Sequence, residues 1–244
     1  MKNAPLSYGQ RGLSLVSLMI ALTIAMFLMA GLFGIWLQTR NTFGDQGDLA
    51  QIQVAERMAV TIVANTVRTG GYYPEYANYS TTPPSPLYTS TGVFTVVAPF
   101  TVAGQFVYGT YSASAPGDSL TVRFMADANT LDCLGQTPTA NTLVVNTFSV
   151  TTDGDLQCSV NGGTAETIVS GVSRMNILYG VDISEGNEAT YQYLTATQVA
   201  AGGYWKYVKS VDLQLIFTNP LSGTGQPATL PVVDRIIAVL QTTS

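Results

Sequence analysis

The 244-residue sequence contains no histidine, and this absence limits the chemistry that the protein can perform. Without imidazole there is no Ser-His-Asp or Cys-His arrangement, and no side chain whose ordinary pKa lies near neutrality. No S-x-x-K sequence accompanies Lys206 or Lys209, and no phosphate-binding loop of the Walker type is present. The sequence therefore predicts a protein that is not an enzyme and that uses no cofactor or metal.

Charged residues are also scarce. Lysine and arginine number 10 and aspartate and glutamate 15, so the formal net charge is −5. Binding of nucleic acid needs a basic face that neutralises phosphates, and this composition argues against it. The cations beyond residue 12, among them Arg57, Arg68 and Arg235, are scattered along the sequence. We therefore expect no nucleic-acid partner.

One long segment carries no charge at all. Residues 13–37 are mostly apolar, and a short leader with Lys2 and Arg11 precedes them. At about 1.5 Å of rise per residue a helix over this segment spans roughly 37 Å, enough to cross a hydrocarbon core of about 30 Å. A secretory signal peptide has its small residue after the apolar run, so this segment is predicted to stay on the mature protein. The positive-inside rule places the leader in the cytoplasm and sends the chain after residue 37 across the membrane.

The junction R-G-L-S-L-V-x-L-M resembles the class III leader of type IV pilins and type II secretion pseudopilins. The resemblance implies that residues 1–12 are a leader peptide, that prepilin peptidase cuts between Gly12 and Leu13, and that the new amino group of Leu13 is methylated. These families usually have a glutamate at the fifth mature position, where it pairs with a neighbouring subunit's terminal amine. Ser17 occupies that position and cannot form the pair, so Ser17 is a candidate subunit-contact residue.

Alternatives stay open for this segment. A subunit at the tip of a filament has no upper amine to neutralise and tolerates Ser17, whereas a serine without positional meaning bonds the carbonyl one turn back. Gly31 and Gly34 either bend the helix or allow close packing of helices in the membrane. An ordinary single-pass anchor without leader processing is the simplest alternative.

Helical periodicity continues beyond the uncharged run. Apolar residues recur at steps of three and four, which predicts that residues 38–71 continue the helix and lay one apolar stripe on a globular core. These residues are Leu49, Ile52, Ala55, Ala59, Ile62 and Val63. Gly70 and Gly71 predict the end of the helix, and Pro74 supports it.

Residues 72–244 contain strands and turns and are predicted to form one extracytoplasmic domain. Residues 76–90 contain three prolines and predict a surface loop. Apolar and alternating runs predict strands at residues 93–100, 119–125, 142–150, 156–160, 173–181, 207–218 and 232–240. A long N-terminal helix followed by a mostly antiparallel sheet indicates the α+β class.

Several motifs in this domain resemble those of PilW-type minor pilins. They are a cysteine in a glycine-containing loop, a second cysteine after a short strand, the stretch G-V-x-x-M-x-x-x-Y-G-V-D, a tyrosine-rich helix or loop, and the stretch W-x-x-V-x-x-V-x-L. The matching residues are Cys133, Gly135, Leu156, Cys158, Gly171, Val172, Met175, Tyr179, Gly180, Val181, Asp182, Tyr191, Trp205, Val208, Val211 and Leu213. The J-type pseudopilins of type II secretion are similar in layout and provide the alternative.

The resemblance implies a pilin-like fold and a non-catalytic minor pilin that helps to initiate type IV pilus assembly, at or near the pilus tip. Its implied partners are other minor pilins, the major pilin, prepilin peptidase and a large tip adhesin. The protein would lie in the inner membrane, with its C-terminal domain in the periplasm, before assembly. After assembly it would lie in the cell-surface pilus.

Cys133 and Cys158 are the only cysteines, and the predicted compartment is oxidising. Two cysteines in such a compartment are expected to form a disulfide. A metal site is the alternative, but two thiolates without histidine make a poor zinc site.

Acidic residues gather in two turn-like sequences. Asp182, Glu185 and Glu188 form one group, and Asp153 and Asp155 form the other. Clustered carboxylates suit Ca²⁺, but turn geometry alone also favours aspartate and glycine in such sequences.

Aromatic residues are abundant, with 13 tyrosines and two tryptophans. This number exceeds what one core needs, and tyrosine and tryptophan are enriched at protein interfaces. Tyr191 and Trp205 are therefore candidate subunit-contact residues. The alternative is that these aromatic side chains cover sheet edges.

Overall fold

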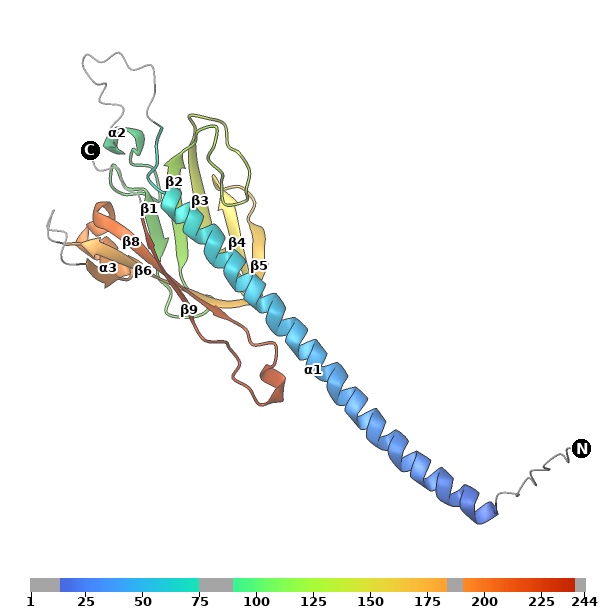
Figure 1. Cartoon of the computed structure of the whole chain (residues 1–244). Coiled ribbons are helices and arrows are strands. Elements are labelled where there is room, and N and C mark those ends of the chain that lie inside the picture. The colour runs from blue at the N-terminus through green and yellow to red at the C-terminus, as the bar shows by residue number, and fades with distance from the viewer. Residues whose placement is uncertain (1–13, 75–89, 184–190, 240–244) are drawn as a thin grey trace, which may run out of the picture. The chain divides into compact units, whose positions relative to one another are not determined.

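The computed structural model describes residues 14–74, 90–183 and 191–239, so almost all of the predicted loop at 76–90 lies outside the described residues. The chain divides into two compact units, Met1–Asp48 and Leu49–Ser244, and each is described by itself. The helix α1, Leu15–Thr69, contributes residues to both units (Figure 1).

The end of α1 agrees with the predicted stop at two glycines. Gly71 adopts the left-handed conformation with φ of 78°, and its N–H donates to the carbonyl of Arg123 at 3.0 Å. Glycine favours this conformation because it has no Cβ, which is why the helix ends here. Upstream, α1 continues without a break through Gly31 and Gly34.

Within the second unit, α1 buries the predicted apolar stripe. Ala59 and Val63 are fully buried, Val67 extends the stripe by one turn, and Ile52 and Ile62 are half-buried against the same core. Steps of three and four residues place these side chains on one face of the helix. The predicted amphipathic character of this part of the helix is therefore confirmed.

Five antiparallel strands form the first sheet. They are β1 (Val107–Thr110), β2 (Ser119–Met125), β3 (Leu143–Val150), β4 (Asp155–Val160) and β5 (Glu166–Ser170), in the spatial order β1-β2-β3-β4-β5. In Figure 1 the cyan part of α1 lies across the green and yellow strands of this sheet. Every second residue of β3 is buried, including Phe148, as expected for a strand with one face on a core.

Four antiparallel strands form the second sheet. They are β6 (Val172–Asp182), β7 (Tyr191–Leu194), β8 (Val208–Phe217) and β9 (Val233–Ala238), in the order β7-β6-β8-β9. The alternation predicted for β8 is confirmed, because Val211, Leu213, Leu215 and Phe217 are all fully buried. The short helix α2 (Ser90–Val93) precedes β1, whereas the helix α3 (Ala196–Gly202) and the 3-10 turns η2 (Tyr204–Tyr207) and η3 (Ser222–Thr224) lie between strands of the second sheet.

One hydrophobic core joins α1 to both sheets. Val63 from α1, Leu120 and Phe148 from the first sheet, and Met175 and Leu213 from the second belong to the same cluster of buried residues. Burying each such side chain contributes about 1.5–3 kcal/mol relative to exposure. The α+β class is confirmed, and the single predicted sheet is two sheets that share this core.

The strand predicted at residues 93–100 is wrong. This segment ends α2 and continues as irregular chain because a buried arginine binds its backbone. Arg123 on β2 donates from Nη1 to the carbonyl of Thr95 at 2.8 Å and from Nη2 to that of Phe94 at 3.2 Å. Those carbonyls are satisfied by a side chain instead of by a neighbouring strand, and Pro99 has no N–H to offer a ladder.

Arg123 is itself fully buried, with no carboxylate among its described contacts. Besides the two carbonyls, it donates from Nε to the carbonyl of Gln105 at 2.6 Å, and its guanidinium carbon lies 4.0 Å from the centre of the Phe100 ring. Burial lowers the pKa of Arg123 to about 10, so the side chain stays charged at neutral pH. Hydrogen bonds and the ring face replace the water that the charge loses.

Three short strands were absent from the prediction. They are β1, β5 and β7, of four or five residues each, and all three lie at sheet edges. The predicted tyrosine-rich helix or loop consists of the strand β7 followed by α3. Short edge strands have too few residues to show a period, so pairing with a longer neighbour defines them.

Cys133 and Cys158 form the expected disulfide, with Cα atoms 6.4 Å apart. Cys158 lies on β4 and Cys133 in the loop between β2 and β3, and both are buried. The N–H of Cys133 donates to Oδ1 of Asn146 on β3 at 3.1 Å. The bridge and this hydrogen bond therefore fix the loop on the first sheet.

We predict that this bridge stabilises the second unit. Replacing both cysteines by alanine should lower the free energy of unfolding by about 2–4 kcal/mol, since the cross-link closes a loop of 25 residues. Urea unfolding of the detergent-extracted chain measures this. Thiol labelling of denatured, unreduced protein is the control, and two free thiols per chain would contradict the prediction.

Candidate functional site

The first candidate surface is the N-terminal part of α1. Residues 15–37 carry no charged side chain, and all of them are exposed within the chain, Phe27 by 81%. By length and composition this helix is able to cross a membrane. A continuous apolar surface of this size indicates contact with lipid or with other apolar helices.

The Ser17 hydroxyl is satisfied within its own helix. Its Oγ donates to the carbonyl of Ser14 at 2.7 Å, and Thr23 bonds Ile20 in the same way at 2.8 Å. This is the bond expected from a serine in an apolar environment, and it spares the hydroxyl from needing an outside partner. Gly12 and Leu13, the predicted processing site, lie outside the described residues.

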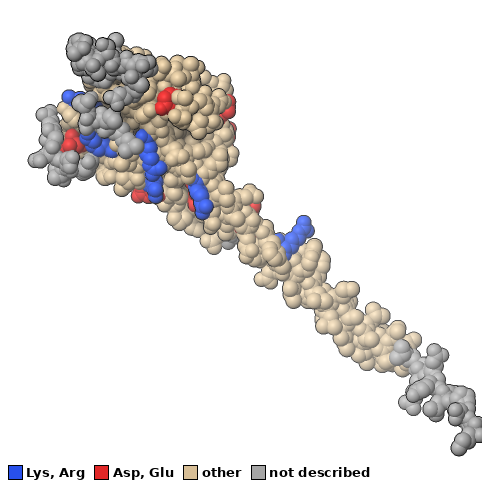
Figure 2. All heavy atoms as spheres, turned by 45° about the horizontal axis from the view of Figure 1, so that its top comes forward, with Lys and Arg blue, Asp and Glu red and all other residues tan. Residues whose placement is uncertain are grey.

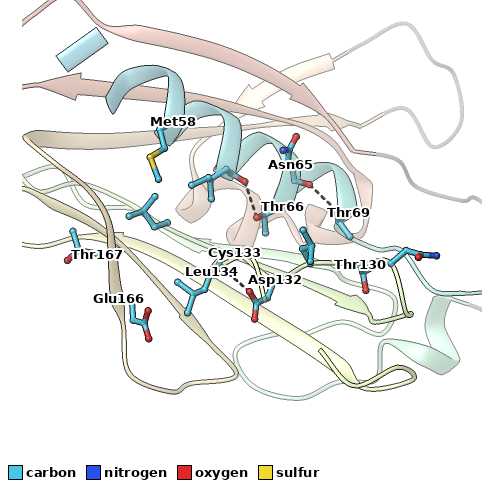
Figure 3. Close-up of a pocket in the computed structure, with 15 residues that line it drawn as sticks. Met58, Asn65, Thr66, Thr69, Thr130, Asp132, Cys133, Leu134, Glu166 and Thr167 are labelled. Atoms are coloured by element: carbon cyan, nitrogen blue, oxygen red, sulfur yellow. Dashed lines mark hydrogen bonds between the residues drawn. The ribbon is translucent and has the colours of Figure 1, made fainter. Parts of the chain in front are cut away.

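The second candidate surface is a groove of about 590 Å³ in the second unit, called here the α1 groove. It lies between α1, the loop that holds Cys133, and the edge strand β5 (Figure 3). Its lining consists of Met58, Ile62, Asn65, Thr66, Thr69, residues 129–135 and residues 166–168. The disulfide thus positions one wall of the groove and the helix the other.

Several polar side chains of the α1 groove are bonded within the chain. Thr66 and Thr69 donate their hydroxyls to α1 carbonyls one turn back, and Oδ1 of Asp132 accepts the N–H groups of Leu134 and Gln136. These polar groups are therefore occupied in shaping the walls, as the labelled side chains of Figure 3 show. Glu166 is the exposed charge at the rim, and the groove has no lysine or arginine in its lining.

Trp205 does not lie at a contact surface, which corrects the prediction for this residue. Only 2% of it is exposed, and its ring lies 5.0 Å from that of Tyr179 and 5.4 Å from that of Tyr108. The hydroxyl of Tyr179 lies against Gly109, where a Cβ would clash. Trp205 therefore belongs to the core, whereas Tyr191 is placed as the first residue of β7 and its side chain lies outside the description.

The acidic groups show no metal site in the described part of the chain. No cluster of three or more potential ligands occurs there. Asp182 is buried near the end of β6, while Glu185 and Glu188 lie outside the described residues. The calcium alternative for these three residues stays a prediction.

Comparison with known families identifies two segments of the chain. Residues 136–232 match the family of type IV pilus-assembly protein W, PilW, and residues 8–33 match the prokaryotic N-terminal methylation motif. The resemblance to PilW is confirmed. Among solved structures, the chain is similar to a type IV-like pilin from Thermus thermophilus, with 13% identity and a TM-score of 0.43 over 79% of this chain and 99% of the other. No curated protein matches the sequence.

The PilW segment contains strands β3 to β8, Cys158 and Trp205. Most of the α1 groove lies outside it, because α1 and the loop with Cys133 precede residue 136. The methylation motif covers Gly12, Leu13 and Ser17. The two matches therefore fall on different parts of the chain, one on the start of the apolar helix and one on the sheets.

Sequence analysis missed a cluster of cations. Arg57 and Arg68 on α1 and Arg235 on β9 line one hollow of about 260 Å³ in the second unit. Only 10% of the residues are charged, so a cluster of three cations is unusual on this protein, and the face shown in Figure 2 has few charged side chains. An 11-residue spacing places Arg57 and Arg68 on one helix face and was visible in the sequence, but nothing local points to Arg235.

The PilW segment also holds a buried carboxyl with a displaced pKa. Asp212 on β8 is 8% exposed, Nε2 of Gln214 donates to its Oδ2 at 3.4 Å, and its Oδ1 has no hydrogen-bond partner in the structure as described. Burial raises the pKa of Asp212 to about 6, and the neighbouring Asp234 adds to this by hydrogen bonding and repulsion.

We predict that Asp212 makes the domain less stable as pH rises. The pKa is higher in the folded chain than its ordinary value of 3.8, so the stabilisation is complete below about pH 4 and is lost as pH passes about 6. Asp212→Asn should raise the free energy of unfolding by about 1–2 kcal/mol at pH 7 and leave it nearly unchanged at pH 4.

Urea unfolding at pH 4 and pH 7 measures this effect. The matched control is Asp153→Asn, which changes an exposed aspartate in the turn between β3 and β4. An equal response of the two variants to pH would contradict the prediction.

Proposed function

We propose that this chain is a minor pilin that helps to initiate assembly of a type IV pilus. The observation that carries the proposal is the helix α1, which begins at Leu15, directly after the predicted cleavage site. It exposes an uncharged surface over residues 15–37 and carries a PilW-type domain. The methylation motif at residues 8–33 supports the same conclusion.

Before assembly, α1 anchors the protein in the inner membrane as a single span. Lys2 and Arg11 precede the uncharged run, so the positive-inside rule favours a periplasmic C-terminal domain. Two buried cysteines joined in a disulfide agree with that compartment. After assembly, the same apolar helix surface is covered by the helices of other subunits.

The role is structural and not catalytic. The chain has no histidine, and the Thr66, Thr69 and Asp132 side chains of the α1 groove already bond its walls. Its partners are other minor pilins and the major pilin, with prepilin peptidase acting on the leader. A large tip adhesin is the expected neighbour on the outer side.

Ser17 supports a place at or near the pilus tip. A subunit with others above it needs a carboxylate to neutralise the next terminal amine within the apolar bundle. The Ser17 hydroxyl carries no charge and cannot neutralise such an amine. Its bond to the Ser14 carbonyl is also the one expected of a serine without positional meaning, so the missing carboxylate alone supports the tip position. Such a residue is best tolerated at the tip, where no amine lies above it. Because a fibre has one tip, we expect few copies of this chain in each fibre.

The leader is predicted to be removed between Gly12 and Leu13. Mass spectrometry of membrane-extracted protein should find Leu13 at the amino terminus, carrying a methyl group. A bulky residue at position 12, as in Gly12→Leu, should block the cut, whereas Gly9→Leu in the same leader should not. An intact Met1 terminus in cells with active peptidase would contradict the pilin assignment.

Deletion of the gene tests the function directly. We expect the deletion strain to lose most surface pili while its secreted enzymes stay at their usual level, and the intact gene to restore pili. Loss of secretion with normal pili would instead assign the chain to a type II secretion pseudopilus. Gold labelling of a tagged copy on sheared pili tests the tip position, and label spread evenly along the shaft would contradict it.

A further inference from the structure

Three of the eight cations beyond the leader gather at one place on the second unit. Arg57 and Arg68 project from α1 and Arg235 from the edge strand β9, and all three are exposed. With Val60, Thr61, Ala64 and Asn65 they line the hollow of about 260 Å³, called here the arginine groove. Residues that are 167 positions apart in the chain thus form one basic surface on a protein of net charge −5.

The arginine groove contains no acidic residue in its lining. Glu56 and Asp234 precede two of the arginines in the chain, but neither lines the groove, and Asp234 interacts with Asp212 instead. Across the described ranges, no carboxylate forms an ion pair with these three guanidinium groups. The one contact within the groove joins Nη1 of Arg68 to Oδ1 of Asn65 at 3.5 Å, which is long for a hydrogen bond.

Other cations of the domain are used within the fold. Arg123 donates to three backbone carbonyls, and Arg174 donates to Asn176 at 2.7 Å and to the carbonyl of Ala113 at 2.8 Å. The arginines of the groove have no such role, so their donors face solvent. Like charges that are held together repel one another, and a bound anion removes that repulsion.

The shape of the groove favours an extended anion. Arg57, Thr61, Ala64 and Arg68 follow steps of four, three and four residues, which places them along one helix face over about 16 Å. Arg235 lies across from them on a strand. Planar guanidinium groups pair with carboxylates through two parallel hydrogen bonds, so three arginines spread along a helix and a strand suit a ligand with several carboxylates.

We propose that the arginine groove binds an acidic segment of a different pilin subunit, through ion pairs between its three guanidinium groups and at least two Asp or Glu carboxylates. We choose an acidic partner because of charge complementarity. This protein has a net charge of −5, so the rest of its surface offers few places for carboxylates to bind. The inference rests on the proposed function, because it places that neighbour beside this chain in the filament. Arginine is also enriched at protein interfaces, whereas lysine is depleted.

The first test measures pili in the deletion strain. The triple variant Arg57→Gln, Arg68→Gln, Arg235→Gln should give about tenfold fewer surface pili than the unmodified chain, since exposed ion pairs are individually weak and act together here. The same three positions changed to lysine should keep most pili. Lys206→Gln removes an exposed cation outside the groove and should have no effect. Full piliation by the triple glutamine variant, at equal membrane levels, would overturn the proposal.

The second test identifies the partner even where the glutamine variant does not accumulate. In membranes from cells that carry the triple lysine variant, a water-soluble carbodiimide joins lysine amines to carboxylates that touch them. We expect links from positions 57, 68 or 235 to Asp or Glu of another protein with an N-terminal methylation motif. The yield should fall in 1 M salt, where charges are screened within about 3 Å.

Links from these positions only to carboxylates of this chain or of a second copy would overturn the proposal. The proposal would also be overturned if positions 57, 68 and 235 formed no links while Lys206 in the same sample did. The proposed function fails in a different way, because a deletion strain with normal pili contradicts it whatever the links show. A link to a secretion pseudopilin would support the binding proposed for the arginine groove, but it would assign the chain to a secretion pseudopilus instead of a pilus.

Discussion

The burial of one face of α1 against both sheets is the contact on which the rest of the second unit depends. Ala59, Val63 and Val67 are small or β-branched, so the helix comes close to the sheets and fills the core without large side chains. The opposite face stays exposed and separates two grooves. The α1 groove and the arginine groove share Asn65 at this ridge, and their charges differ in sign, with Glu166 on one side and three arginines on the other. A surface of this kind suits association in which each subunit presents different faces to its neighbours.

Two internal connections hold irregular chain against the first sheet. Arg123 binds the carbonyls of residues 94, 95 and 105, and the disulfide binds the loop that carries Cys133. In both places no neighbouring strand among the described residues pairs with the irregular segment, so a side chain or a covalent bond holds it instead. The first connection fixes the segment after α2, and the second forms a wall of the α1 groove. Both therefore keep irregular chain in a defined shape without extending the sheet.

The chain matches the N-terminal methylation motif over residues 8–33 and the PilW family over residues 136–232. Between them lies the part of α1 that packs on the sheets, and it carries the exposed Arg57 and Arg68. A weakly charged surface lets a few charged groups dominate recognition, because little else competes for opposite charges. The binding proposed for the arginine groove relies on this scarcity, since the whole chain has only 10 basic residues.

The sequence alone determined those elements whose cause is local. The uncharged run at residues 13–37 predicted an apolar helix, and two glycines predicted its end at Thr69. Alternation over β8 and the apolar run of β2 predicted long central strands, β2 with its observed bounds, because many residues there share one face of a sheet. The compartment and the cysteine count predicted the disulfide.

Only the tertiary structure decided the features that depend on distant residues. Trp205 is a core residue because Tyr108 and Tyr179 meet it there, which its local sequence does not show. Residues 94–100 are irregular because Arg123, more than 20 positions away, binds their carbonyls. The edge strands β1, β5 and β7 exist only by pairing with longer neighbours. The arginine groove needs α1 and β9 side by side, and no periodicity of either element encodes that meeting, because the packing of the whole core brings them together.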